Sequence, residues 1–221
     1  MKSQWLHRSR QERLIIFCNG WGMDATPFQP IGVRDYDLLM FFDYYDLILD
    51  CDLATLFQSY QDIVLISWSM GVWAGQQIFQ PWSHRLRKAI AVNGTLCPIH
   101  DQFGIPVALY EATLAQFSEA GRLKFYRRMC RDHRSVDAFL KNQPQRSLEN
   151  QRRELASLLG QVSCRPAEDA IYTQVVIADK DLVVPAANQL AFWQGEGVHR
   201  IEGAHFPFYG WQSWDELVAT P

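Results

Sequence analysis

Short apolar runs recur along the chain and alternate with longer segments of helical periodicity. The runs at residues 14–18, 38–42, 63–66, 88–92, 173–178 and 198–201 predict buried β-strands. Helical patterns lie between several of these strands, at residues 71–79 and after Pro185, and helix-start chemistry occurs within residues 24–30. Strands that alternate with helices predict βαβ units and a mostly parallel sheet flanked by helices.

The strand signal disappears between the fourth and fifth predicted strands. Residues 107–131, 135–142 and 147–159 carry helical patterns there instead. A helical insertion at this point would cover the carboxyl ends of the strands, where open α/β sheets bind ligands. We therefore expect a core formed by residues 1–106 and 166–221 with a helical lid at residues 107–165. The leader before residue 14 is short and charged, so we expect a sheet trimmed at its N-terminal edge.

A candidate nucleophile lies where the third predicted strand meets a helix. The segment is Ser67-Trp68-Ser69-Met70-Gly71. A nucleophile elbow needs small residues two positions before and two positions after its serine, because strand and helix approach closely there. Gly71 meets this need, and Ser67 stands where glycine is more common. The alternative is that Ser69 only caps a helix N-terminus.

The loop Gly20-Trp21-Gly22 follows the first predicted strand and suits an oxyanion hole. Acyl transfer builds negative charge on a carbonyl oxygen, which preorganised backbone N–H groups stabilise. The N–H after the nucleophile, that of Met70, and the N–H of Trp21 are the expected donors. Taken alone, the loop favours an ordinary glycine-rich turn, but together with the elbow it favours the oxyanion hole.

The remaining two members of a serine triad follow later strands. Asp179 and Asp181 both come after the strand at residues 173–178. Asp181 is favoured because it lies four residues before Pro185, the typical distance between the orienting aspartate of such hydrolases and the proline that opens the next helix. Asp179 stays as the competing candidate. His205 follows the last predicted strand and is the expected general base. The chain order Ser, Asp, His is that of an α/β-hydrolase fold.

Composition and cysteine usage fit an ordinary enzyme domain. The 221 residues are 48% hydrophobic and 20% charged. No apolar run approaches the ~20 residues of a membrane helix, and the N-terminus lacks a signal-peptide apolar region. Five cysteines without a CxxC pair predict reduced thiols in a cytoplasmic protein. Neither an HExxH motif nor a phosphate-binding loop occurs, so we expect no metal and no cofactor.

The net charge of −3 hides an uneven distribution. Residues 122–153 contain ten basic and three acidic side chains, a net charge of +7, so the remainder carries −10. A basic segment of this kind can be a simple solvated face. On so acidic a background it favours docking of an anionic partner.

These motifs resemble α/β-hydrolases that demethylate pimeloyl-[acyl-carrier protein] methyl ester in biotin synthesis. The resemblance covers the glycine loop, the elbow, residues 181–185 and residues 204–208, and residues 139–143 resemble an F-L-x-x-Q stretch of that family. The short N-terminus, Asn19 in place of the usual histidine, and residues 42–46 resemble its compact BioG branch. The resemblance implies a serine carboxylesterase that releases methanol. It also implies an acyl chain bound near Trp21, Met70, Phe125, Phe139, Gln143 and Phe206.

The same resemblance implies that lid arginines hold the acidic acyl carrier protein. Arg134, Arg152 and Arg153 are the expected contacts. Ala138 stands where a relative has arginine, so the contacts extend to Arg127, Arg128 or Arg131. We expect a monomer without nucleic-acid or membrane partners. A thioesterase for carrier-bound or small acyl groups and a general short-chain carboxylesterase remain alternatives, as does a non-catalytic hydrolase-like binding protein.

Overall fold

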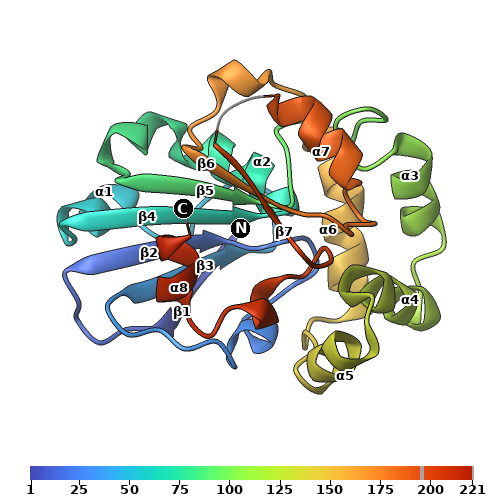
Figure 1. The fold of residues 1–221 in the computed structure, drawn as a ribbon, viewed down its shortest axis with the longest axis horizontal. Helices are drawn as coiled ribbons and strands as arrows, with labels where there is room; N and C mark the ends of the chain where they lie inside the picture. The colour runs from blue at the N-terminus through green and yellow to red at the C-terminus, as the bar shows by residue number, and fades with distance from the viewer. Residues whose placement is uncertain (195–196, 221) are drawn as a thin grey trace.

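A single twisted sheet organises the computed structural model, which describes residues 1–194 and 197–220. Within these residues seven strands pair in the order β1-β3-β2-β4-β5-β6-β7 (Figure 1). The strands are β1 (Lys2–His7), β2 (Arg13–Cys18), β3 (Asp37–Phe42), β4 (Asp62–Trp68), β5 (Lys88–Val92), β6 (Gln174–Ala178) and β7 (Val198–Ile201). All neighbouring pairs are parallel except β1 with β3. The predicted mostly parallel sheet is confirmed.

Both faces of the sheet are covered, which explains why the central strands are continuous apolar runs. Along β2, Ile15 and Phe17 face one apolar cluster, whereas Leu14 and Ile16 face the other. The helices α1 (Leu53–Gln58), α2 (Met70–Phe79) and α7 (Ala186–Trp193) contribute to the second cluster. The first cluster receives side chains from the helix α8 (Trp214–Ala219) and from two 3₁₀ turns, Thr26–Phe28 and Phe208–Gly210.

The N-terminal edge differs in detail from the expectation. The leader is not merely polar, because it forms β1 and pairs with β3 from Lys2 opposite Phe42 onward. The hydrophobic pattern of the sequence did not predict this strand, because its side chains are exposed or half-buried and form no apolar run. The short helices α1 and α8 had also escaped prediction.

Four helices of the insertion gather at one end of the sheet (Figure 1). They are α3 (Val107–Ala115), α4 (Glu119–Cys130), α5 (His133–Lys141) and α6 (Leu148–Gln161). The predicted single helix at residues 107–131 is wrong, because it breaks into α3 and α4. The side chain of Ser118 accepts a hydrogen bond from Gly121 N and so begins a new helix. Ser147 caps α6 in the same way.

One cysteine pair corrects the expectation of reduced thiols. Cys97 and Cys164 form a disulfide across a sequence separation of 67 residues, while Cys18, Cys51 and Cys130 are free. Cys97 follows β5 and Cys164 follows α6, so the two ends of the helical insertion meet at this bond. Spacing along the chain could not indicate a contact that only the fold creates. Among the described residues, no helix is long and apolar enough to cross a membrane.

Candidate active site

Ser69 occupies a sharp turn between β4 and α2. Its φ of 57° lies in the left-handed region, a strained backbone conformation for a side chain other than glycine. The turn is tight enough that a Cβ at position 71 would lie 2.2 Å from the Cys18 carbonyl oxygen, so only glycine fits. The Ser69 N–H donates to Val92 O over 2.9 Å, which ties the turn to β5. This geometry is that of the elbow expected from the sequence.

His205 and Asp181 complete a hydrogen-bonded series that begins at Ser69. His205 Nε2 lies 2.8 Å from Ser69 Oγ, and His205 Nδ1 lies 2.8 Å from Asp181 Oδ2. A carboxylate can only accept, so the ring proton belongs on Nδ1 and leaves Nε2 free to accept from the serine. All three residues are buried. Three segments distant in the sequence therefore meet with the geometry of a general base and its nucleophile.

The surroundings of Asp181 separate it from its competitor. Its Oδ1 accepts the N–H groups of Val183 (2.8 Å) and Val184 (3.0 Å), and Oδ2 also accepts from Gln189 Nε2 (2.9 Å). These donors fix the carboxylate and direct one oxygen at His205. Asp179 is exposed and instead accepts the N–H of Gly203. The structure thus brings Asp181, and not Asp179, to the histidine.

Asn93 supports the histidine loop and had escaped the sequence analysis. Its Nδ2 donates to His205 O over 3.0 Å, and its Oδ1 accepts from Ala178 N over 2.7 Å. Trp68 Nε1 also donates to His205 O, at 2.8 Å. The position of Asn93 at the end of β5 and beside a glycine was the available signal, since strand ends of this sheet carry the site.

A small cavity of about 30 Å³ opens at Ser69. Trp21, Met70 and Phe125 line it, as the resemblance implied. Ile105, Leu155 and Val183 also line it, and no sequence motif had marked these side chains. Within the described part of the chain, the backbone N–H groups of Trp21 and Met70 donate to no protein acceptor. Both N–H groups are therefore available to a ligand.

The other three residues expected along the acyl chain are not among those that line this cavity. Phe139 is fully buried and packs with Tyr126 and Phe206, with ring centroids 5.0 Å apart in both pairs. Phe206 continues this aromatic cluster toward Phe28. Gln143 lies in the connection between α5 and α6 and is absent from the lining. The rings of Phe139 and Phe206 pack within the core at α5, and a contact of these three residues with an acyl chain stays a prediction.

Two further cavities extend from the site toward the surface between α3 and α4. The next cavity, of about 40 Å³, shares Trp21, Phe125 and other lining residues with the first. A third, of about 210 Å³, shares Phe125 and Arg128 with the second and adds Lys124. We call this series of three adjoining cavities, which begins at Ser69 and ends beside Lys124 and Arg128, the apolar route.

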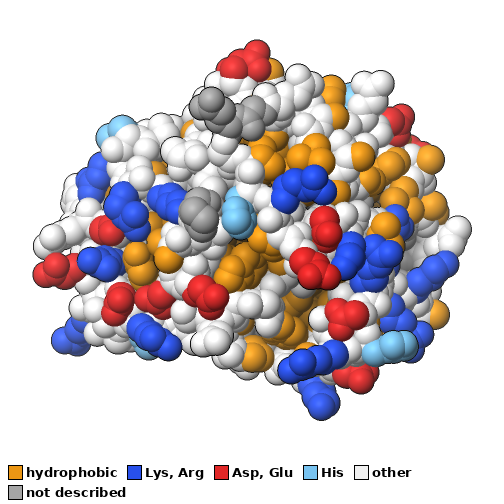
Figure 2. Space-filling model, viewed as in Figure 1, with side chains coloured by type: hydrophobic (Ala, Val, Ile, Leu, Met, Phe, Trp, Pro, Cys, Tyr) orange, Lys and Arg blue, Asp and Glu red, His pale blue; other side chains and the backbone are white. Residues whose placement is uncertain are grey.

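The basic segment divides into buried and exposed parts. Arg122 pairs with Glu119, and Arg146 is buried between two carboxylates, so these two charges are neutralised within the protein. Arg128 donates to Leu182 O. Burial lowers the pKa of its guanidinium, and the charge of Asp181 offsets only part of this shift. Over the end of the molecule that carries α4 and α5, Figure 2 shows many Lys and Arg side chains with carboxylates among them.

The arginines expected to contact the carrier do not form one patch. Arg127, Arg131, Arg134, Arg152 and Arg153 are all exposed. Arg131 and Arg134 line a separate groove of about 910 Å³ that also includes Lys180. The Arg153 guanidinium lies 4.6 Å from the ring centroid of Tyr45, on the loop after β3. The described residues include no group of three or more His, Cys, Asp or Glu able to hold a metal ion.

Comparisons with known proteins identify the family and the fold. The family model "Pimeloyl-ACP methyl esterase BioG" matches residues 1–217. The crystal structure of BioG from Haemophilus influenzae is 33% identical, with a TM-score of 0.89 and coverage of 98% of this chain and 99% of that one. A putative aryl esterase from Burkholderia cenocepacia, 17% identical with a TM-score of 0.62, covers 93% and 87% of the two chains and shares the fold.

A longer relative also matches. A Bacteroides fragilis protein named malonyl-[acyl-carrier protein] O-methyltransferase is 39% identical over 199 residues. The match takes in 89% of this chain, which spans only 40% of the length of that relative. The family match over nearly the whole chain and the full-length structural likeness lead to one conclusion. This chain belongs to the BioG family of pimeloyl-ACP methyl esterases and has the α/β-hydrolase fold.

Proposed function

We propose that this chain is a serine carboxylesterase that hydrolyses the methyl ester of pimeloyl-[acyl-carrier protein] in biotin synthesis. The observation that carries the proposal is the hydrogen-bonded series Ser69, His205, Asp181 at the inner end of an apolar route. Family membership supplies the substrate class, and the series supplies the chemistry. The carrier-linked substrate assigns the reaction to the cytoplasm.

The reaction follows from the placement of these groups. Ser69 Oγ attacks the ester carbonyl carbon while His205 Nε2 takes the hydroxyl proton, and Asp181 stabilises the resulting imidazolium. The N–H groups of Trp21 and Met70 hold the negative oxygen of the tetrahedral intermediate. His205 then returns the proton to the leaving methoxide, and methanol departs. A water molecule, deprotonated by His205, attacks the acyl-serine and releases the free carboxylate with Ser69 restored.

The shape of the route favours an ester at the far end of the acyl chain over a thioester beside the carrier. A terminal methyl ester needs little space at the serine, because the rest of the chain extends outward to the carrier. The cavity of about 30 Å³ at Ser69 suits a methoxy group. A thioesterase would need room for the whole acyl tail beyond the serine as well as room for the pantetheine arm.

The mouth of the route also suits the carrier protein. Lys124 and Arg128 lie beside the outer cavity on α4, and Arg127 is exposed on the same helix. Acyl carrier proteins are strongly acidic, so a basic helix at the mouth favours their approach. We therefore extend the expected docking contacts to Lys124, with α4 as the principal docking helix.

Mass spectrometry of the pimeloyl-carrier methyl ester tests the proposal. The wild-type chain is expected to lower the mass of the acylated carrier by about 14 Da, as a methyl ester becomes an acid, and Ser69→Ala is expected to cause no change. Loss of the entire acyl group would identify a thioesterase instead. No labelling of Ser69 by a fluorophosphonate, together with no mass change, would favour a non-catalytic binding protein.

A further inference from the structure

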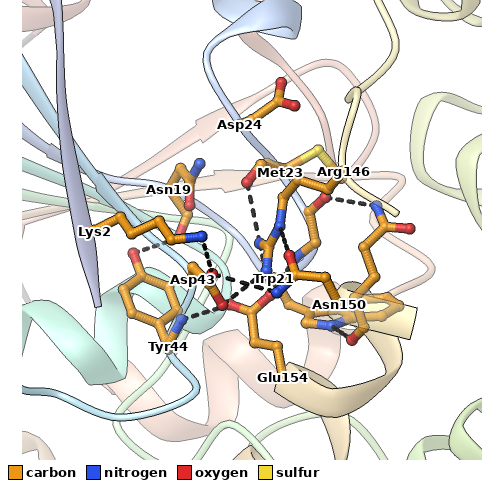
Figure 3. Close-up of polar contacts among 12 residues, drawn as sticks. Lys2, Asn19, Trp21, Met23, Asp24, Asp43, Tyr44, Arg146, Asn150 and Glu154 are labelled. Carbon is orange, nitrogen blue, oxygen red and sulfur yellow. Dashed lines mark hydrogen bonds and ion pairs between the residues drawn. The ribbon is translucent and has the colours of Figure 1, made fainter. Parts of the chain in front are cut away.

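A buried ion cluster joins the lid to the loop that carries Trp21. Arg146, in the connection between α5 and α6, places Nη2 2.9 Å from Asp43 Oδ1 and Nη1 2.7 Å from Glu154 Oε2 (Figure 3). The exposed fractions of these three side chains are only 6%, 5% and 0%. Lys2 Nζ adds a fourth charge 2.9 Å from Asp43 Oδ2. The cluster is therefore formally neutral, as buried charges must be to remain ionised.

The two carboxyl groups respond differently to this environment. Burial alone would raise the pKa of Asp43, but the hydrogen bond from Lys2 and the charge of Arg146 outweigh it and lower the pKa. Burial raises the pKa of Glu154, and the charge of Arg146 offsets only part of that rise. Burying the charge of Glu154 therefore costs free energy, and the groups that contact its carboxylate must offset this cost.

Those contacts converge on residues 21–23. Glu154 Oε2 accepts the N–H of Gly22 over 3.1 Å, and its Oε1 accepts the N–H of Tyr44 over 2.7 Å. Gln151, one turn earlier on α6, donates from its side-chain Nε2 to Gly22 O over 2.7 Å. Its backbone carbonyl oxygen accepts the Trp21 indole N–H over 2.9 Å. Hydrogen bonds from one helix therefore hold the N–H and the C=O of Gly22, which belong to the two peptides that flank this residue, and they hold the Trp21 side chain as well.

Arg146 completes the attachment from the other side. Its Nη1 donates to Met23 O over 3.2 Å, and its Nε donates to Asn150 Oδ1 over 2.7 Å, which holds the guanidinium against the start of α6. Figure 3 shows the guanidinium between Asp43 and Glu154, with Trp21 and Met23 beside it. The loop thus has lid partners at three consecutive residues.

We propose that Glu154, held by Arg146, is a positioning residue that fixes the Gly22 peptide and thereby directs the neighbouring Trp21 N–H at the developing oxyanion. The backbone angles of Trp21 set the direction of its N–H, and they are fixed once the following peptide and the indole are held. Donors to an oxyanion accelerate the reaction because they are preorganised, and one donor is worth about 10²–10³-fold in kcat. The inference rests on the proposed serine chemistry and on Trp21 as a donor, but not on the carrier-linked substrate.

The test separates positioning from stability. Glu154→Gln keeps the size of the side chain but replaces one of its two acceptor oxygens by an NH₂ group. The N–H groups of Gly22 and Tyr44 bond to different oxygens of Glu154, so the variant cannot accept both. Turnover of p-nitrophenyl acetate would be measured per active site, with sites counted by fluorophosphonate labelling. We expect kcat to fall about ten- to hundredfold with KM changed less than about threefold. Affinity for a trifluoromethyl ketone, which forms an oxyanion on Ser69, should fall with kcat.

Ser157→Ala is the matched control on the same helix. Ser157 Oγ donates to Tyr45 O over 2.7 Å, so its loss weakens a contact between α6 and the core without touching residues 21–23. We expect this variant to lose stability and keep its kcat per site. Gln151→Met, which removes the bond to Gly22 O and leaves the charges in place, should lower kcat without a large change in KM.

Three results would count against the inference. Glu154→Gln with kcat within twofold of wild type per labelled site would make the cluster a purely structural tie. If Glu154→Gln does not fold, an unchanged kcat in Gln151→Met would have the same meaning. A wild-type chain with neither ester turnover nor fluorophosphonate labelling would overturn the serine chemistry and this inference with it.

Discussion

At the scale of single residues, the site depends on side chains whose orientation is set by several partners at once. Asp181 accepts two backbone N–H groups and one side-chain amide before it meets His205. Such a carboxylate can hold the imidazole in one tautomer without moving during the reaction. Its value to catalysis then lies in orientation and in the stabilisation of the imidazolium.

Asp181→Asn should lower kcat by about 10⁴-fold, because an amide at this position can present its NH₂ group to His205 and favour the wrong tautomer. Steady-state kinetics on a small ester would measure the effect. Asp179→Asn is the control from the same loop, and it should retain most activity because the Asp179 carboxylate accepts the Gly203 N–H, whereas His205 bonds to Asp181. A stronger loss in Asp179→Asn than in Asp181→Asn would refute the assignment.

The residues of the proposed triad could be singled out because each follows a predicted strand and the three occur in a fixed chain order. Ser69 and His205 could be identified in this way, and the choice of Asp181 rested on its distance from Pro185. The role of Arg146 was not visible, since a basic residue within a basic segment looks like a solvated side chain. The burial of Phe139 in the aromatic cluster was likewise not visible. An apolar helix position indicates burial but does not say which cavity or cluster receives it.

At the scale of elements, the lid consists of helices with different attachments. α6 contributes Leu155 and Leu158 to the apolar cluster that contains Trp21 and Met70. α4 instead exposes Lys124 and Arg127, and its Arg128 reaches the loop that carries Asp181. The inner helix thus shapes the site, and the outer helix faces solvent at the mouth of the route.

Charge reversal helix by helix should identify the docking element. Lys124→Glu with Arg127→Glu on α4 is expected to lower kcat/KM for the carrier-linked ester about tenfold or more, through slower association, with little effect on a small ester. Arg152→Glu with Arg153→Glu on α6 is the comparison at equal charge change, and Arg134→Glu tests α5. Equal losses on both substrates would remove the docking role, and a larger carrier-specific loss from the α6 pair would move docking to that helix.

Element boundaries were predictable where burial is complete and uncertain elsewhere. The strand β5, which is buried after Lys88, begins and ends where its apolar run does. The break between α3 and α4 lacks proline or glycine at residues 116–118, so the helical pattern continues across it. The edge strand β1 shows no buried apolar run, because it pairs on one side only and none of its side chains is fully buried.

At the scale of the whole molecule, the disulfide closes the insertion at its base. Cys97 and Cys164 join the chain just before α3 to the chain just after α6, so the four lid helices form one covalent loop. Closing a loop of this length lowers the conformational entropy of the unfolded chain. For a separation of 67 residues the loop-entropy model gives a stabilisation of the folded state of about 4 kcal/mol.

Cys164→Ala should therefore lower the free energy of unfolding by about 4 kcal/mol relative to the oxidised wild type. Urea unfolding with and without dithiothreitol would measure this difference, which should largely disappear in the reductant. Cys51→Ala is the control, because Cys51 is a free and half-buried cysteine. Identical stabilities of the wild type and Cys164→Ala without reductant would show that the bond does not form in solution.

The attachment of α6 sets a boundary for redesign of the enzyme. Arg146, Gln151 and Glu154 bind the loop of the core at residues 21–23, whereas α3, α4 and α5 form the outer part of the insertion. A chimera that takes residues 107–142 from a relative would exchange the outer wall and keep the native scaffold of the reaction centre. A chimera that takes the whole insertion would also replace Arg146, Gln151 and Glu154 and their contacts with residues 21–23. Selectivity for acyl length is therefore best transplanted with the shorter segment.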